Sequence, residues 1–102
     1  MLKTLFFLVP VILLNSAAAP STEQVAVQGI VIDKQTNQPI PNSYIYIVRG
    51  EEEALTDSKG KFSINTWQSL PVTLTVDDPK YKKVTITVSK AGTKHVIPLE
   101  AR

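Results

Sequence analysis

Cysteine is absent from this 102-residue chain, and histidine and tryptophan occur once each, as His95 and Trp67. Without cysteine there is no disulfide, no thiolate nucleophile and no cysteine-ligated metal. One histidine is too few for a histidine-rich zinc site, and no Gly-x-Ser-x-Gly segment indicates a serine hydrolase. The composition therefore predicts no catalytic residue, no cofactor and no metal, and stability has to come from strand pairing and packing.

An excess of charge of one sign is also lacking. The chain has 11 Lys and Arg against 9 Asp and Glu, and the basic residues after the N-terminus are scattered from Lys34 to Arg102. A nucleic-acid-binding surface requires a clustered basic stripe. The nearest cluster, Lys80, Lys82 and Lys83, is typical of a solvated turn or strand edge. No nucleic-acid partner is predicted.

Long hydrophobic runs are limited to residues 5–14, which follow Lys3 and precede small residues up to Ala19. This order is that of a secretory signal peptide. The run is about half of the roughly 20 residues that cross a bilayer as a helix. We predict a signal peptide at 1–18, a flexible leader at 19–24 and one domain at 25–102, exported to the periplasm or secreted, with no membrane span after cleavage.

The domain alternates apolar and polar residues with a period of two. Turn residues interrupt the alternation about every eight to twelve residues, and no segment has a sustained helical period. This pattern is typical of an all-β protein and predicts a small β-sandwich of about seven strands. The clearer strands begin near Val25, Tyr44, Lys61, Val72, Val84 and His95, and a weaker one includes residues 54–56.

Several carboxylates fall between the predicted strands. Residues 51–53 are three glutamates after Gly50, which indicate a solvated hairpin tip. A calcium cage is the alternative, but consecutive side chains on extended backbone point to opposite faces and converge poorly. Asp77 and Asp78 stand before Pro79, where carboxylates accept backbone hydrogen bonds of a turn, rather than facing each other across a cleft.

The stretch "ALTDSKGKFSI", residues 54–64, joins two predicted strands. Asp57 can cap a turn through its carboxylate, and Gly60 can adopt the positive φ that the chain reversal requires. The catalytic alternative combines Ser58, Asp57 and His95 as a triad. The turn interpretation needs no ion and no nucleophile, and we favour it.

Aromatic residues supply the candidate binding surface. Tyr44 and Tyr46 are two residues apart on one strand and therefore share a face, and Trp67 lies in an irregular segment. Exposed rings stack on sugars or contact a protein partner, whereas buried rings supply core area. Tyr44, Tyr46 and Trp67 are the predicted binding residues.

Several motifs occur in order along the chain: Gly29-Ile30-Val31, Asp33, Pro39-Ile40, Asn42, Thr56-Asp57, Gly60 and Phe62. In these motifs the sequence resembles the carboxypeptidase regulatory-like domain family. The resemblance covers roughly residues 27–99 and implies a seven-stranded antiparallel Greek-key β-sandwich of the transthyretin-like type. In that family the domain stands beside zinc carboxypeptidases or ahead of bacterial TonB-dependent receptors, and the catalytic residues belong to the neighbour. One departure is Lys80-Tyr81, which stands where many members have Gly-Tyr.

These observations predict an exported, non-catalytic module of bacterial origin. It would act in protein–protein interaction or structural support in the cell envelope, with an unidentified envelope protein as partner. The alternative is a carbohydrate-binding module that holds polysaccharide on Tyr44, Tyr46 or Trp67. A third and weaker alternative is a small hydrolase of transthyretin-like architecture with His95 as its base.

Overall fold

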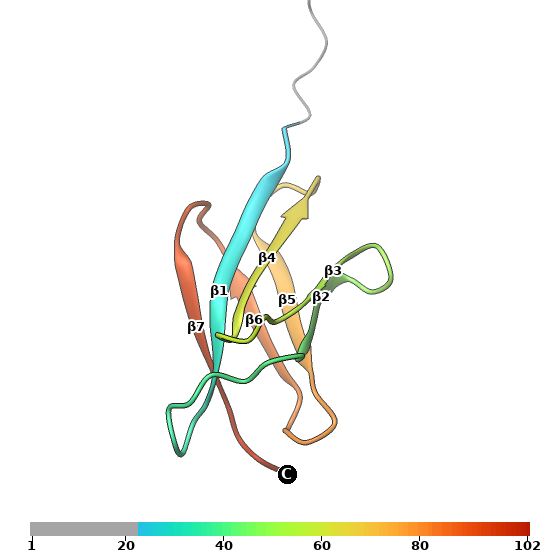
Figure 1. The fold of residues 1–102 in the computed structure, drawn as a ribbon. Helices are drawn as coiled ribbons and strands as arrows, with labels where there is room; N and C mark the ends of the chain where they lie inside the picture. Colours follow the sequence, from blue (N-terminus) through green and yellow to red (C-terminus); the bar gives the residue numbers. More distant parts are fainter. Residues whose placement is uncertain (1–22) are drawn as a thin grey trace, which may run out of the picture.

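The computed structural model describes residues 23–102, which form two β-sheets packed face to face (Figure 1). The predicted signal peptide and most of the leader lie outside the described residues. Residues 23–102 contain no helix, as the period-two alternation predicts. The strands are β1 (Val25–Asp33), β2 (Tyr44–Val48), β3 (Glu52–Leu55), β4 (Lys61–Thr66), β5 (Val72–Asp77), β6 (Val84–Val88) and β7 (Lys94–Leu99).

One sheet has three strands in the order β4-β1-β7, and the other has four in the order β3-β2-β5-β6. The β-sandwich prediction is confirmed. One pair differs from the antiparallel expectation, because β7 lies parallel to β1. Both strands start at the upper end of the molecule in Figure 1, where the chain crosses from β6 to β7. Alternation within a strand carries no information about the direction of its neighbour.

The core lies between the sheets and consists of alternate residues from each strand. In β4 the pattern is regular, with Phe62, Ile64 and Thr66 buried and the residues between them exposed. Burying one face of each strand supplies the main favourable term in folding a domain without disulfides. The fully or nearly fully buried apolar side chains are Val27, Val31, Ile40, Ile45, Phe62, Ile64, Val72, Leu74, Val76, Val88, Ile97 and Leu99.

Two local expectations are corrected. Strand β3 begins at Glu52, so the glutamates of residues 51–53 do not all form the hairpin tip. Thr75 is a polar residue of the alternating pattern and is expected to face solvent, but it is buried, whereas Thr73 of the same strand is exposed. Thr75 lies on a central strand, opposite Tyr46 on β2 and Thr85 on β6, and neighbours on both sides cover it.

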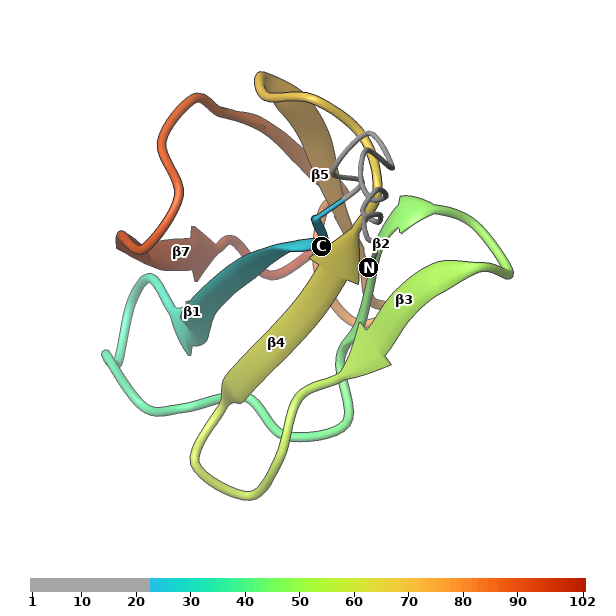
Figure 2. The ribbon, with the colours of Figure 1, turned by 90° about the horizontal axis from the view of Figure 1, so that it is seen from above.

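Four strands lie at sheet edges: β4 and β7 in one sheet, β3 and β6 in the other. Pro98 falls in β7, an edge strand, and its missing N–H is compatible with that position. Figure 2 shows β3 beside β4 at one margin of the sandwich, where the two sheets meet through a short turn. The β1–β2 and β5–β6 connections both lie at the lower end of Figure 1, on either side of the C-terminus.

Candidate functional site

The turn between β3 and β4 is built around Asp57. Its Oδ1 accepts hydrogen bonds from the backbone N–H groups of Lys59 and Lys61, both at 2.9 Å. The backbone closes the same turn, with Asp57 N–H donating to Lys61 O at 2.9 Å and Gly60 N–H donating to Asp57 O at 2.9 Å. These hydrogen bonds, that from Lys61 first, lower the pKa of Asp57. The carboxylate therefore serves the turn.

Gly60 has φ of 74° and lies against β1. A Cβ at this position would meet Val31 O at 2.6 Å and the Pro39 side chain at 3.0 Å. The contact is fixed, because Val31 N–H donates to Gly60 O at 2.8 Å and Val31 O accepts from Ile40 N–H at 3.0 Å. Glycine is needed here both for its conformation and for its lack of a side chain.

Asp78 is buried at 7% exposure and joins the β5–β6 connection to the start of β2. Its Oδ2 accepts from the Ser43 hydroxyl at 2.6 Å, and its Oδ1 accepts from Lys80 N–H at 2.8 Å. Ser43 N–H in turn donates to Thr56 Oγ1 at 2.8 Å, and the Thr56 hydroxyl donates to Ile40 O at 2.6 Å. Each of these buried groups has a partner, as a stable polar cluster requires.

Asp33 organises the neighbouring loop. Its Oδ1 accepts from the N–H groups of Gln35 and Thr36, at 2.8 and 3.1 Å. Its Oδ2 accepts from the Tyr81 hydroxyl at 2.9 Å. The hydrogen bond from Thr36 and then that from Tyr81 lower the pKa of Asp33, while the same Asp33 contact raises the pKa of Tyr81. The tyrosine thus ties the β5–β6 connection to the end of β1.

Tyr44 and Tyr46 lie together on the outer face of the four-stranded sheet, as predicted, with ring centroids 5.4 Å apart. Arg49 lies over both rings, its Cζ 4.6 Å from the Tyr46 centroid and 5.6 Å from that of Tyr44. Arg49 also pairs with Asp77 at 2.9 Å, and Tyr44 donates to Glu53. The pKa of Tyr44 is raised chiefly by that hydrogen bond to Glu53.

The position of Arg49 reduces the tyrosine ring surface that a ligand could contact. A guanidinium on the ring faces occupies the surface on which a sugar would stack, because cation–π contact and sugar stacking use the same face. We name Tyr44, Tyr46 and Arg49 the tyrosine–arginine patch. Arg49 is not among the binding residues predicted from the sequence. The sequence feature that could have indicated it is the turn after β2, which folds Arg49 back over its own strand.

Trp67 lies in the β4–β5 connection, away from the loops at the lower end of Figure 1. Its side chain is 62% exposed, and its backbone N–H donates to Glu52 Oε2 at 3.2 Å. The structure therefore places Trp67 on a connection at the end of the sheets and the two tyrosines on a sheet face. The binding role of all three residues stays a prediction.

His95 lies on β7 with its side chain partly buried, and its Nε2 is buried without a hydrogen-bond partner. The Asp57 Oδ1 is bonded to the N–H groups of its own turn. No hydrogen bond joins His95 to Ser58 or Asp57 in the described part of the chain, so the structure does not assemble the triad considered from the sequence.

Among residues 23–102, no three metal-ligating side chains of the His, Cys, Asp or Glu type gather at one place. In the same part of the chain, no helix has the length and apolar character needed to cross a bilayer.

The described residues form a small β-sandwich. The carboxylates of Asp33, Asp57 and Asp78 accept hydrogen bonds within its turns. The chain belongs to the CarboxypepD_reg-like domain family, whose model matches residues 27–101. Four of the motif residues that carry the family resemblance, Asp33, Thr56, Asp57 and Gly60, make the contacts within the turns and loops described above.

Solved structures that are similar to this chain include a pilin and a lipoxygenase. A streptococcal ancillary pilin matches with 13% identity and a TM-score of 0.49, covering 78% of this chain and 30% of that chain. A 9R-lipoxygenase from Cyanothece PCC8801 matches with 16% identity and a TM-score of 0.47, covering 85% of this chain and 17% of that chain. This chain thus spans less than a third of either protein. A comparison with well-characterised proteins found no match.

Proposed function

We propose that residues 25–102 form an exported, non-catalytic module that binds a protein partner in the cell envelope. The observation that carries the proposal is the place of the exposed apolar side chains. Leu55 on β3 and Val96 on β7 are 61% and 62% exposed, and both strands are sheet edges. Exposed apolar residues beside unpaired strand edges are typical of surfaces that bind protein. The carboxylates of Asp33, Asp57 and Asp78, in contrast, accept hydrogen bonds within turns.

The test is chemical cross-linking and capture in an envelope fraction of the source cells, with the exported chain as bait. We expect one partner in fixed stoichiometry with the wild-type protein. A Leu55→Asp, Val96→Asp double variant should lose it, because each carboxylate replaces an exposed apolar contact. Thr87→Asp is the matched control, since Thr87 is exposed on the edge strand β6. Equal capture by both variants would refute a role for these two edge strands.

Export is tested separately. The signal peptide predicted at 1–18 should be removed, so that the protein isolated from the envelope or medium begins at Ala19. Mass determination of the intact protein measures this directly. A protein that keeps Met1 and stays in the cytoplasm would contradict the export part of the proposal.

Carbohydrate binding is the second candidate, and the exposure of Trp67 favours it. An exposed indole ring offers a face for a sugar, whereas Arg49 covers the tyrosine rings. Retention of the protein on a polysaccharide column should then fall in Trp67→Ala and stay unchanged in Tyr46→Ala. Equal retention of the wild type and Trp67→Ala would remove this candidate.

A further inference from the structure

The outer face of the three-stranded sheet carries a group of adjoining aliphatic side chains. In β1, residues 28, 30 and 32 are more exposed than the buried residues between them, so they point away from the core. Ile30 lies beside Val96 of β7, and Ile32 lies beside Pro98. Val96 is 62% exposed and Pro98 is exposed, whereas both isoleucines are half-buried. We name Ile30, Ile32, Val96 and Pro98 the aliphatic patch. Apolar side chains that adjoin on an exposed face are typical of a binding surface.

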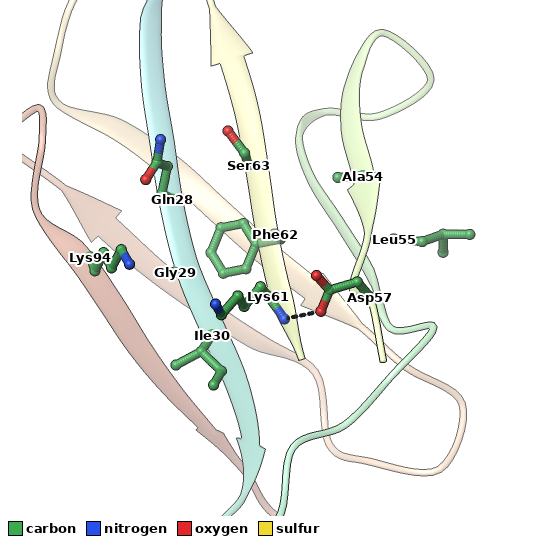
Figure 3. A pocket seen from close by; sticks show the side chains of 10 residues that line it. All are labelled: Gln28, Gly29, Ile30, Ala54, Leu55, Asp57, Lys61, Phe62, Ser63 and Lys94. Carbon is green, nitrogen blue, oxygen red and sulfur yellow. Dashed lines mark hydrogen bonds between the residues drawn. The ribbon is translucent and has the colours of Figure 1, made fainter. Parts of the chain in front are cut away.

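Two exposed lysines flank the patch on the same face. Lys61 of β4 lies beside Ile30, and Lys94 of β7 lies beside Gln28, so the two lysines stand on strands about 10 Å apart with β1 between them. A groove of about 510 Å³ lies over β1 and β4 and has both lysines in its lining. Figure 3 shows Gln28 and Ile30 between the lysines, and the Lys61 side chain leans over β1, away from Asp57. Both ammonium groups can therefore reach an anionic group above β1.

The carboxylates at the margins of this face are already engaged. Asp57 accepts the N–H groups of its own turn, and residues 57–61 contain two lysines against this one carboxylate. Glu52 accepts a backbone N–H of the β4–β5 connection, at the far end of β4 from Lys61. Glu100, which follows β7, pairs with a lysine of the β5–β6 connection at 3.4 Å. Within residues 23–102, neither Lys61 nor Lys94 forms an ion pair. The face is therefore positively charged as well as apolar.

Aliphatic side chains beside lysines suit a phospholipid surface. A lysine can lay its methylene chain along apolar surface while its ammonium group contacts a phosphate. A sugar requires a ring on which to stack, and the outward residues of β1, β4 and β7 include no aromatic side chain. Face-to-face pairing of two copies would bring the lysines of both together, with no carboxylate among the outward strand residues to separate them.

We propose that the outer face of the β4-β1-β7 sheet binds the surface of an anionic phospholipid bilayer. Lys61 and Lys94 contact lipid phosphates, and the aliphatic patch enters the interfacial layer beneath them. Attraction to anionic lipid and burial of apolar area add in such a contact. Lipid binding goes beyond the proposed function and does not depend on a protein partner.

The first test is co-sedimentation of the purified protein with vesicles of equal parts phosphatidylglycerol and phosphatidylcholine. We expect half of the protein to be bound at about 1 mM lipid, with less binding at high salt and little binding to vesicles of phosphatidylcholine alone. Absence of binding to the anionic vesicles at low salt would overturn the proposal. Equal binding to both kinds of vesicle would overturn the role of the lysines.

Lys94→Gln tests the charge of the face. Its affinity for the anionic vesicles should fall about fivefold, the contribution of one lysine near an anionic surface. Lys83→Gln is the matched control, because Lys83 is exposed and directly precedes β6 in the other sheet. This control should bind nearly as well as the wild type. Equal loss in the two variants would reduce the effect to net charge and overturn the site.

Val96→Thr tests the aliphatic patch. Threonine keeps the shape and β-branching of valine but replaces a methyl group by a hydroxyl, so affinity for the vesicles should fall about fourfold, the equivalent of one buried methylene. The control is Leu55→Thr, since Leu55 is 61% exposed and lies beside Tyr44 in the other sheet. Both variants keep residues 1–24. Equal binding by the wild type and both variants would overturn the assignment to the sheet face.

A phosphatidylcholine with a nitroxide on its acyl chain locates the contact directly. Added to the anionic vesicles, it should broaden the methyl signals of Ile30, Ile32 and Val96 more than those of Leu55. Stronger broadening of the Leu55 methyl signals would assign the contact to the other sheet and overturn the proposal. A stable dimer in sedimentation that Val96→Thr abolishes would assign the face to a second copy and also overturn it.

These outcomes are separable from those of the proposed function, because the vesicles contain no partner protein. A wild type that binds vesicles but captures no partner would support the lipid-binding face and refute the proposed function. A wild type that captures a partner but binds no vesicles would refute lipid binding alone.

Discussion

Replacing Gly60 by alanine should lower the free energy of unfolding for two reasons, one conformational and one steric. The first is conformational, because a residue with a side chain at φ of 74° loses about 1–2 kcal/mol. Alanine also restricts the unfolded chain more than glycine does, which offsets about 0.4–1 kcal/mol of this cost. The second is steric, since the new Cβ would lie 2.6 Å from Val31 O, a backbone atom held by its hydrogen bond to Ile40. Overpacking of this kind costs about 1–3 kcal/mol.

Gly92 provides the matched control. Its φ is 78°, and a Cβ there would have no atom within 4 Å. Gly92→Ala therefore carries the conformational cost alone, about 0.5–1 kcal/mol net. Gly60→Ala should lose about 1.5–4 kcal/mol, a large part of the stability of a small domain.

Urea unfolding followed by far-ultraviolet circular dichroism measures both values. We expect the free energy of unfolding of Gly60→Ala to lie about 1–3 kcal/mol below that of Gly92→Ala. If the two variants are equally stable, the close approach of the turn to β1 has no energetic role, and the reasoning is refuted.

Three further predictions concern the carboxylates. Asp78→Ala should lower the free energy of unfolding by about 1.5–3 kcal/mol, because the Ser43 hydroxyl and Lys80 N–H lose a charged acceptor. Asp78→Asn should lower it by less, and equal losses in the two variants would contradict the role of the charge. Asp57 has a lowered pKa in the folded state, so its contribution to the free energy of unfolding is present above the unfolded value near 3.9 and is lost as pH falls through the lower folded value. The melting temperature of the wild type should therefore drop in acid, and that of Asp57→Asn should drop less. Adding a chelator should leave the melting temperature unchanged, and a fall of several degrees would reveal a bound cation that stabilises the fold.

The strands and their turns could be predicted because their causes are local. Alternation in Lys61–Thr66 fixes which side chains face the core, and Pro98 places the last strand at an edge. The turn at Asp57 and Gly60 follows from a carboxylate that bonds N–H groups two and four residues away. The candidate binding residues Tyr44 and Tyr46 share a face for the same local reason.

Other features needed partners that are distant in the sequence. The burial of Asp78 depends on Ser43, 35 residues away, and that of Thr75 on neighbouring strands. The same limit applies to Arg49, whose position over the tyrosine rings also involves Asp77, 28 residues away.

By itself, the sequence determined that this protein is a β-sandwich with Asp57 and Gly60 in a turn, because period-two burial and turn chemistry act over a few residues. Only the tertiary structure decided that β7 runs parallel to β1 and that β4 lies at the edge of its sheet. Strand order and direction depend on how the connections cross between the sheets, and the pattern within a single strand contains no record of that crossing.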